Sequence, residues 1–347
     1  MKSKPLVTSA SCTSLFGVLP NGQEIHAYEI SNSKGMTLNV MDYGATLVAL
    51  KKTLKNGEVI DVVLGFDNLN DYVNSYSLPS APYFGTTIGR YAGRIAQARF
   101  ELNGTEISLQ PNNNGNTLHG GVEGFSQKVW QLKQLTTGTN PSITLSYISV
   151  DGEESFPGEL QVEVTYLLTE ENELVIEYKG LSTKDTVVNL THHSYFNLDG
   201  QYASILDQDL QINASQFLET EDMIPTGKLL PTANSSFDFR NSKSCPESID
   251  TTFALDVKEV QVASLLSKKN NLRMLVFTNQ PAVHVYVGGN CFNQIIGKEG
   301  TSYHSQSGVC FETQNFPDAP NHTHFPSAVL KQGEIYFQKT IYQFQSF

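Results

Sequence analysis

The sequence predicts an all-β fold, built as one large antiparallel β-sandwich with few and short helices. Short segments in which apolar and polar residues alternate recur from end to end, and β-branched and aromatic side chains are frequent in them. Gly, Asn, Asp or Pro residues bound these segments. The clearest are TLNVMDYG from residue 37, RFELNGTEISL from 99, LQVEVTYLL from 160, ELVIEYKG from 173 and AVHVYVGG from 282.

Turn signals between these segments indicate antiparallel pairing. Asn103-Gly104 separates two strand-like runs and is a strong hairpin signal, and LTEENEL from residue 168 joins two more strands. Stretches with a period of 3.6 residues are few, and EVQVASLLSK from 259 is an ambiguous one. No repeat of fixed period and no low-complexity linker interrupts the chain. We therefore expect a single domain over residues 1–347.

The composition is that of a globular protein with an acidic surface. Apolar residues make up 39% of the 347 residues, including 19 Phe and 15 Tyr, and can form a large core. The net charge of −12 disfavours nucleic acid and anionic membranes as partners, because their phosphates would repel the protein. A neutral ligand such as a free sugar would be little affected by this charge.

The four cysteines and the N-terminus bear on the cellular compartment. Cys12, Cys245, Cys291 and Cys310 form no C-x-x-C pair, so we expect reduced and mostly buried thiols. The N-terminal residues lack the apolar stretch of a signal peptide, and no run of about 18 apolar residues exists. These features predict a cytoplasmic protein without a transmembrane helix.

The segment GVCFETQNFPDAPNH, which begins at residue 308, places a carboxylate inside an otherwise apolar strand. Alternate side chains of a strand face the same way, so Val309 and Phe311 should point to one face and Cys310, Glu312 and Gln314 to the other. If the first face is core, Glu312 faces a pocket or solvent.

Histidines occur in two further polar segments. NTLHGG contains His119 followed by two glycines, which allow a sharp turn or a close approach to a ligand. In NLTHHSYFNLDG, His192 and His193 are adjacent and cannot both face one pocket. His193 shares its face with Tyr195, and we expect His193 to act in the pocket while His192 packs.

Arginines and an aspartate complete the set of candidate polar residues. Arg90 and Arg94 in IGRYAGRI could donate to several hydroxyls, or could pair with surface acids. Asp250 in ESIDTTFAL, taken alone, is typical of a helix or turn cap. A glutamate with a pKa near 4.3 and a histidine near 6.5 suit proton transfer on a polyol at neutral pH.

Seven segments in the same order resemble the aldose 1-epimerase family, also called the galactose mutarotases, and the resemblance covers nearly the whole chain from about residue 15. The segments are YFGTTIGRYAGRIAQARF, NTLHGG, DGEESFPGEL, LTHHSYFNLDG, SFDFR, NQPAVHVYVGGN and GVCFETQNFPDAPNH. The resemblance implies a supersandwich of antiparallel strands and the interconversion of α and β anomers of a free aldose, such as D-galactose or D-glucose. It implies no cofactor and a role in hexose metabolism.

The resemblance also implies roles for individual residues. Glu312 matches the general base that takes the proton from the hydroxyl on C1, and His193 matches the general acid that protonates the ring oxygen. His119 matches a second histidine near the ring oxygen. Positions that hold sugar hydroxyls and the base are matched by Arg94, Tyr195, Asp250 and Gln280. The expected partner is a free monosaccharide, and the chain is expected to be a monomer or homodimer.

Two positions depart from the family pattern. Gly93 stands where some members have an asparagine that contacts the sugar, and Thr251 stands where a histidine is common. Both departures bear on the choice of sugar rather than on the chemistry at C1.

Three alternatives stay open from the sequence. A glycosidase would need two carboxylates, for which only Asp250 could join Glu312. A metal site could use His119, His193 and Glu312, with His322 and His324 nearby in the sequence. A sugar-binding β-sandwich without catalysis would use the aromatic side chains, although residues such as Trp130 are more often part of a core.

Overall fold

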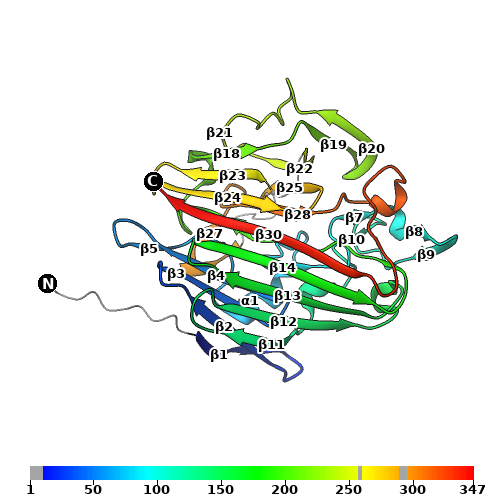
Figure 1. Cartoon of the computed structure of the whole chain (residues 1–347), viewed down its shortest axis with the longest axis horizontal. Coiled ribbons are helices and arrows are strands. Elements are labelled where there is room, and N and C mark those ends of the chain that lie inside the picture. The colour runs from blue at the N-terminus through cyan, green and yellow to red at the C-terminus, as the bar shows by residue number, and fades with distance from the viewer. Residues whose placement is uncertain (1–10, 257–259, 289–294) are drawn as a thin grey trace.

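The computed structural model describes residues 11–256, 260–288 and 295–347, and almost all of its regular structure is antiparallel β-sheet. The largest sheet has nine strands and runs across the view in Figure 1 from β11 at the bottom, through β30, to β23 and β18 at the top. In sheet order its strands are β11 (Gln131–Thr136), β12 (Ser142–Ser149), β13 (Leu160–Leu168), β14 (Glu173–Ser182), β30 (Ile335–Ser346), β24 (Leu272–Thr278), β23 (Gln261–Ser267), β18 (Gln208–Ile212) and β21 (Lys243–Ser244).

Two further sheets complete the main architecture. A five-stranded sheet near the N-terminus consists of β1 (Ser11–Val18), β2 (Glu24–Ser31), β3 (Met36–Met41), β4 (Thr46–Thr53) and β5 (Val59–Asp61). A six-stranded sheet has the order β17 (Tyr195–Phe196), β28 (Val309–Gln314), β25 (Ala282–Val287), β22 (Ile249–Ala254), β19 (Gln216–Glu221) and β20 (Ile224–Pro231). Apolar side chains of all three sheets meet in one buried core, which includes Leu38, Ile176 and Phe311.

Short strand pairs and turns connect the sheets. The pairs are β6 (Thr87–Ile88) with β16 (Thr191–His192), β7 (Arg94–Ile95) with β10 (Thr117–Leu118), β8 (Arg99–Leu102) with β9 (Thr105–Ser108), β15 (Thr186–Val187) with β29 (Val329–Leu330) and β26 (Ile295–Ile296) with β27 (Ser302–Tyr303). The helical elements are α1 (Leu69–Ser75) and the 3₁₀ turns η1 (Ala96–Ala98), η2 (Phe125–Gln127), η3 (Glu153–Ser155), η4 (Ile205–Asp207), η5 (Lys298–Gly300) and η6 (Ala319–Asn321). The predicted all-β class with few short helices is therefore confirmed.

Several local predictions can be compared with the structure. Asn103 and Gly104 both have positive φ and join β8 to β9, as the hairpin signal predicted. The ambiguous stretch from residue 259 is not a helix, because residues 261–267 form strand β23; Glu259 lies outside the described residues. Asp250 caps no helix or turn, because it lies inside β22.

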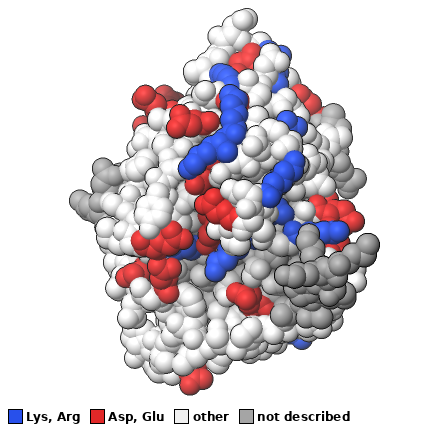
Figure 2. All heavy atoms as spheres, turned by 90° about the vertical axis from the view of Figure 1, so that its left-hand side faces the viewer, with Lys and Arg blue, Asp and Glu red and all other residues white. Residues whose placement is uncertain are grey.

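Three of the four cysteines lie in the described residues. Cys12 is an exposed free thiol and Cys245 is a buried one; Cys310 is also buried, and Cys291 lies outside the described residues. Within the described ranges, no helix has the length and apolarity needed to cross a bilayer. On the face drawn in Figure 2, acidic and basic side chains lie next to one another, so this face is not uniformly charged.

Candidate active site

A cavity of about 490 Å³ lies over one face of the six-stranded sheet. Three adjacent strands of that sheet, β22, β25 and β28, each contribute two side chains to it. These are Asp250, Thr252, His284, Tyr286, Glu312 and Gln314. In each strand the two contributing residues are two positions apart, as the alternation of side chains in a strand requires.

Glu312 lies in this cavity wall as the sequence alternation predicted. Val309 and Phe311 are fully buried in the main core on the opposite face of β28. Glu312 is only 3% exposed, and its direct cross-strand neighbour is His284 on β25. The carboxylate therefore sits on a strand that the core holds in place from behind.

His193 is the closest histidine to this carboxylate. Its Nε2 lies 3.5 Å from Oε1 of Glu312, and both side chains are almost completely buried. The backbone N–H of His193 donates to the carbonyl of Thr86, and Nδ1 lies 3.6 Å from the thiol sulfur of Cys310. Burial lowers the pKa of His193 below its usual range, while the charge of Glu312 opposes this shift. The two groups form a close pair of buried titratable side chains.

His192 points away from the cavity, which confirms that the two adjacent histidines face opposite ways. Its ring packs against Tyr166 at a centroid distance of 5.6 Å, and its Nδ1 lies 3.1 Å from the Ser194 hydroxyl. Burial lowers the pKa of His192 to about 3, so it is neutral at physiological pH. His192 is a packing residue.

His119 enters the cavity from the loop after β10. The backbone N–H of Gly93 donates to its Nδ1 at 3.3 Å, so Nε2 carries the hydrogen in the neutral ring. Its ring centre lies 5.6 Å from that of His193. Loss of hydration lowers the pKa of His119 well below its usual range, and the neighbouring His193 adds to this shift. His119 is therefore a neutral hydrogen-bond donor beside His193 and Glu312.

Arg94 and Asp250 bring opposite charges to the same cavity. Nε of Arg94 donates to Oδ1 of Asn113 at 3.0 Å, which orients the guanidinium group. Burial lowers the pKa of Arg94, and the charges of Asp250 and Glu312 partly restore it. Arg94 remains a cation near neutral pH, so it can donate to hydroxyls of a bound ligand.

His284 is a cavity residue that the sequence analysis did not single out. Its Nε2 lies 3.0 Å from Oδ1 of Asp250, and its Nδ1 lies 2.8 Å from the Thr252 hydroxyl. Burial alone would lower the pKa of His284, but the bond to Asp250 raises it overall. Burial likewise tends to raise the pKa of Asp250, but the bond to His284 helps to lower that pKa overall. The alternation in AVHVYVGG puts His284 and Tyr286 on one face, and this pattern could have identified His284 from the sequence.

Gln314 was expected on the face of Glu312, but no role was given to it. Its side chain lines the cavity and is 1% exposed. Within the described part of the chain, its Oε1 has no hydrogen-bond partner. This oxygen can accept a hydrogen bond from a ligand hydroxyl.

Two of the expected substrate-binding residues do not line the cavity. Gln280 precedes β25, and its side-chain amide donates to Oδ1 of Asn279. Tyr195 is fully buried in the second core cluster, where its ring lies 5.3 Å from the His193 ring. The resemblance assigned both residues to positions that hold sugar hydroxyls or the base, and these roles stay predictions; in the structure Tyr195 packs beside His193.

Arg90 also has a different environment from the two that the sequence left open. It is 2% exposed and donates to the carbonyl oxygens of Pro157 and Gly158 at 3.0 and 2.8 Å, and to Ser149. It therefore neither reaches the cavity nor pairs with a surface acid. Trp130 is likewise a core residue, with 1% exposure.

The two departures from the family pattern lie in different places. Gly93 lines the cavity with φ +77°, and a Cβ there would crowd Pro317, so this position favours glycine. Thr251 is buried on the face of β22 opposite to Asp250 and Thr252, outside the cavity. Only the departure at Gly93 can therefore affect ligand contacts directly.

A metal ion could be held by three of these residues. The ligand atoms of His119, His193 and Glu312 all lie within 4.8 Å of one another. His322 and His324 do not join this cluster, since His322 lies 3.3 Å from Asp318 and His324 contacts the Gly227 carbonyl. The cluster alone has the composition of a two-histidine, one-carboxylate site.

Comparisons with known proteins agree with the fold. The family model described as aldose 1-epimerase matches residues 26–343. A galactose mutarotase from Sus scrofa is 38% identical over 344 residues, which are 95% of this chain and 97% of that protein. An aldose 1-epimerase from Escherichia coli K12 is 33% identical over 343 residues, with 94% and 96% covered.

Solved structures extend this likeness to three dimensions. The crystal structure of a galactose 1-epimerase from Lactobacillus acidophilus matches with a TM-score of 0.85 and 26% identity, covering 97% of this chain and 99% of that one. A homologue of the same family from Caenorhabditis elegans matches with a TM-score of 0.84 and 29% identity, covering 92% and 98%. By sequence and by fold, the chain belongs to the aldose 1-epimerase family of isomerases.

Proposed function

We propose that this protein interconverts the α and β anomers of a free aldose, such as D-galactose or D-glucose, in hexose metabolism. The observation that carries this proposal is the distance of 3.5 Å between His193 Nε2 and Glu312 Oε1. Anomer exchange removes a proton from the hydroxyl on C1 and adds one to the ring oxygen. Both oxygens are bonded to C1, so the acid and the base must lie close together.

The proposed reaction begins with proton transfer at both oxygens. The Glu312 carboxylate takes the proton of the C1 hydroxyl, and protonated His193 gives its Nε2 proton to the ring oxygen. The bond between C1 and the ring oxygen breaks, and the open-chain aldehyde forms. Rotation about the C1–C2 bond exposes the other face of the aldehyde. Ring closure then returns both protons, with Glu312 as the acid and His193 as the base.

The remaining cavity residues would orient the sugar. His119 donates from Nε2 toward the ring oxygen, where it stabilises the negative charge that builds up during ring opening and closure. Arg94 and the Asp250–His284 pair offer donors and acceptors for hydroxyl groups on the other carbons. The Gln314 Oε1 atom offers one more acceptor.

Polarimetry tests the proposal directly. Freshly dissolved α-D-galactose and α-D-glucose should reach equilibrium rotation faster with the protein than without it, and the ratio of rates ranks the two sugars. Glu312→Gln, which keeps the shape but removes the base, should lower kcat by about 10² to 10⁴-fold. Glu173→Gln is the matched control, since Glu173 lies on β14 and bonds only to Thr169 and Gln343 among the described residues. Unchanged activity of Glu312→Gln would refute the assignment of the base.

Three other assays separate the alternatives. Release of nitrophenol from nitrophenyl glycosides would indicate a glycosidase. Metal found by elemental analysis, together with loss of activity in a chelator, would indicate a metal enzyme built on His119, His193 and Glu312. Sugar binding without faster anomer exchange would indicate a binding module. The cytoplasmic location and the monomeric or dimeric state stay predictions.

A further inference from the structure

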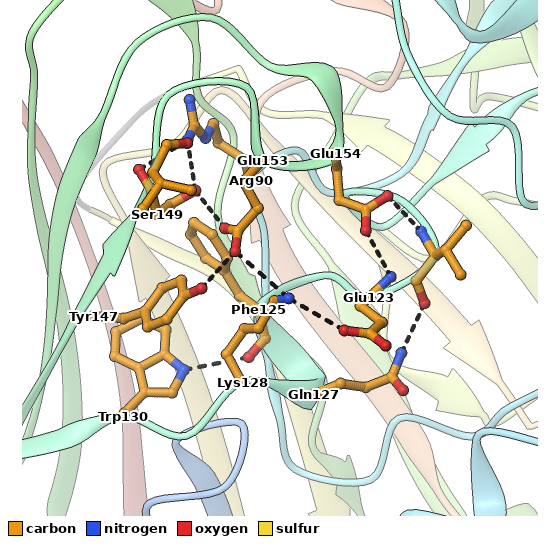
Figure 3. A network of polar contacts seen from close by, with 12 residues as sticks. Arg90, Glu123, Phe125, Gln127, Lys128, Trp130, Tyr147, Ser149, Glu153 and Glu154 are labelled. Atoms are coloured by element: carbon orange, nitrogen blue, oxygen red, sulfur yellow. Dashed lines mark hydrogen bonds and ion pairs between the residues drawn. The ribbon is translucent and has the colours of Figure 1, made fainter.

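The carboxylate of Glu154 lies against the loop that carries His119. Oε2 of Glu154 accepts the backbone N–H of Val122 at 2.9 Å, and Oε1 accepts the N–H of Glu123 at 3.0 Å (Figure 3). Glu154 comes from η3, in the segment DGEESFPGEL, to which the reaction described above gives no role. His119 and Val122 both line the cavity. One carboxylate outside the cavity therefore accepts two consecutive N–H groups of the loop that includes the cavity-lining Val122.

The loop passes over Glu154 closely because two glycines follow His119. Gly120 and Gly121 have φ values of +89° and +113°, and a Cβ at Gly121 would overlap the Glu154 carboxylate. On the other side of the loop, Nδ2 of Asn112 donates to the Gly121 carbonyl at 2.6 Å. The loop is thus held between Asn112 and Glu154.

A network of half-buried polar contacts supports the turn that carries Glu154. The neighbouring Glu153 accepts hydrogen bonds from the hydroxyls of Tyr147 and Ser149, and Lys128 lies 3.5 Å from it (Figure 3). Arg90 donates to Ser149 and to the carbonyl of Gly158, which follows the turn. These contacts fix the backbone on both sides of Glu154, so its carboxylate is a rigid support rather than a loose surface group.

We propose that Glu154 is a positioning residue that sets the place of His119 in the cavity through the N–H groups of Val122 and Glu123. This proposal rests on the proposed function, because it requires His119 to act on the bound sugar. A carboxylate accepting two backbone N–H groups forms charge-assisted bonds, which are stronger than bonds between neutral groups. Without them, the loop is held from the Asn112 side, by the Gln127 bond to the Val122 carbonyl and by the two bonds between His119 and Gly93.

Replacing Glu154 should lower turnover more than it lowers stability. Val122 and Glu123 are exposed, so water can satisfy their N–H groups in Glu154→Ala, and the fold should persist. A small displacement of His119 should reduce kcat by about 10-fold to 100-fold, while KM changes little. Glu154→Gln keeps one acceptor oxygen and should recover part of the lost kcat.

Glu170→Ala is the matched control for the loss of such a carboxylate. Glu170 also accepts from a backbone N–H, that of Ser33 at 3.1 Å, and from the Ser33 hydroxyl. It does not line the cavity. We expect kcat for this variant to equal that of the wild type.

A double-mutant cycle by polarimetry tests whether Glu154 acts through His119. If it does, Glu154→Ala should cost little further activity in a His119→Asn background. Independent losses that multiply in the double variant, or full activity of Glu154→Ala, would overturn the proposal. Failure of the proposed function itself would look different, because the wild type would then not accelerate anomer exchange at all.

Discussion

The adjacent histidines give a sharp test, because one faces the cavity and the other faces the core. In His193→Asn the side chain can no longer exchange a proton near neutral pH. His193 is 4% exposed, and a water molecule in its place would be a much weaker acid than a positioned imidazolium. The loss in kcat should therefore be that of removing a positioned acid, about 10² to 10⁴-fold. The buried Glu312 carboxylate also loses a partner, which should cost about 1 to 3 kcal/mol of stability.

His192→Asn should have the opposite profile. His192 is 3% exposed and packs on Tyr166, and its Nε2 has no hydrogen-bond partner among the described residues. Removing part of this ring leaves a cavity in the core, with a cost of about 1 to 3 kcal/mol. His192 does not line the cavity, so kcat should stay at the wild-type value.

Polarimetry on fresh α-D-galactose gives kcat and KM for each variant, and thermal unfolding gives its stability. Both variants must be measured at a temperature where unfolding curves show them folded. Equal losses of kcat in the two variants, or a larger loss in His192→Asn, would contradict the assignment of faces to this segment.

Three further predictions concern other parts of the molecule. His284→Gln removes the ring nitrogen that lies 3.0 Å from Asp250, so KM should rise about 10-fold, measured by polarimetry on galactose and glucose, with a smaller change in kcat. Burial raises the pKa of Asp42 from 3.8 to about 6 in the folded protein, so the protonated form favours folding. Relative to Asp42→Asn, the wild type should lose thermal stability as the pH rises from about 4 to about 6. In Gly120→Ala the new Cβ would overlap the Gly89 carbonyl, so both melting temperature and kcat should fall.

The sequence predicted the fold well because strand alternation is a local property. The segments from residues 160, 173 and 282 alternate clearly, and each became a strand with one buried face. The ambiguous segment from 259 alternates less clearly, and there the tertiary contacts of β23 with β24 decided for strand. Propensity at single positions could not decide this, since strand pairing involves residues far apart in the sequence.

The site was predictable only in part, for a related reason. Alternation within one strand put Glu312 on its own face, and the same rule separated His192 from His193. Which strands are neighbours depends on pairing across the sheet, and only that pairing puts His284 beside Glu312. Gln280 was expected in the site from the family resemblance. It lies before the first residue of β25 and is not among the residues that line the cavity.

The proposed acid and base on the one hand, and His119 on the other, are held in place by different means. Glu312 lies in the middle of a sheet, and His193 lies between two short strands whose partners are β6 and β28. Moving either would break backbone hydrogen bonds of the core. His119 lies on a loop with positive φ, and hydrogen bonds from outside the cavity hold that loop. Substitutions around the loop can therefore change turnover in small steps, whereas substitutions in the strands lose the acid/base pair and fold stability together.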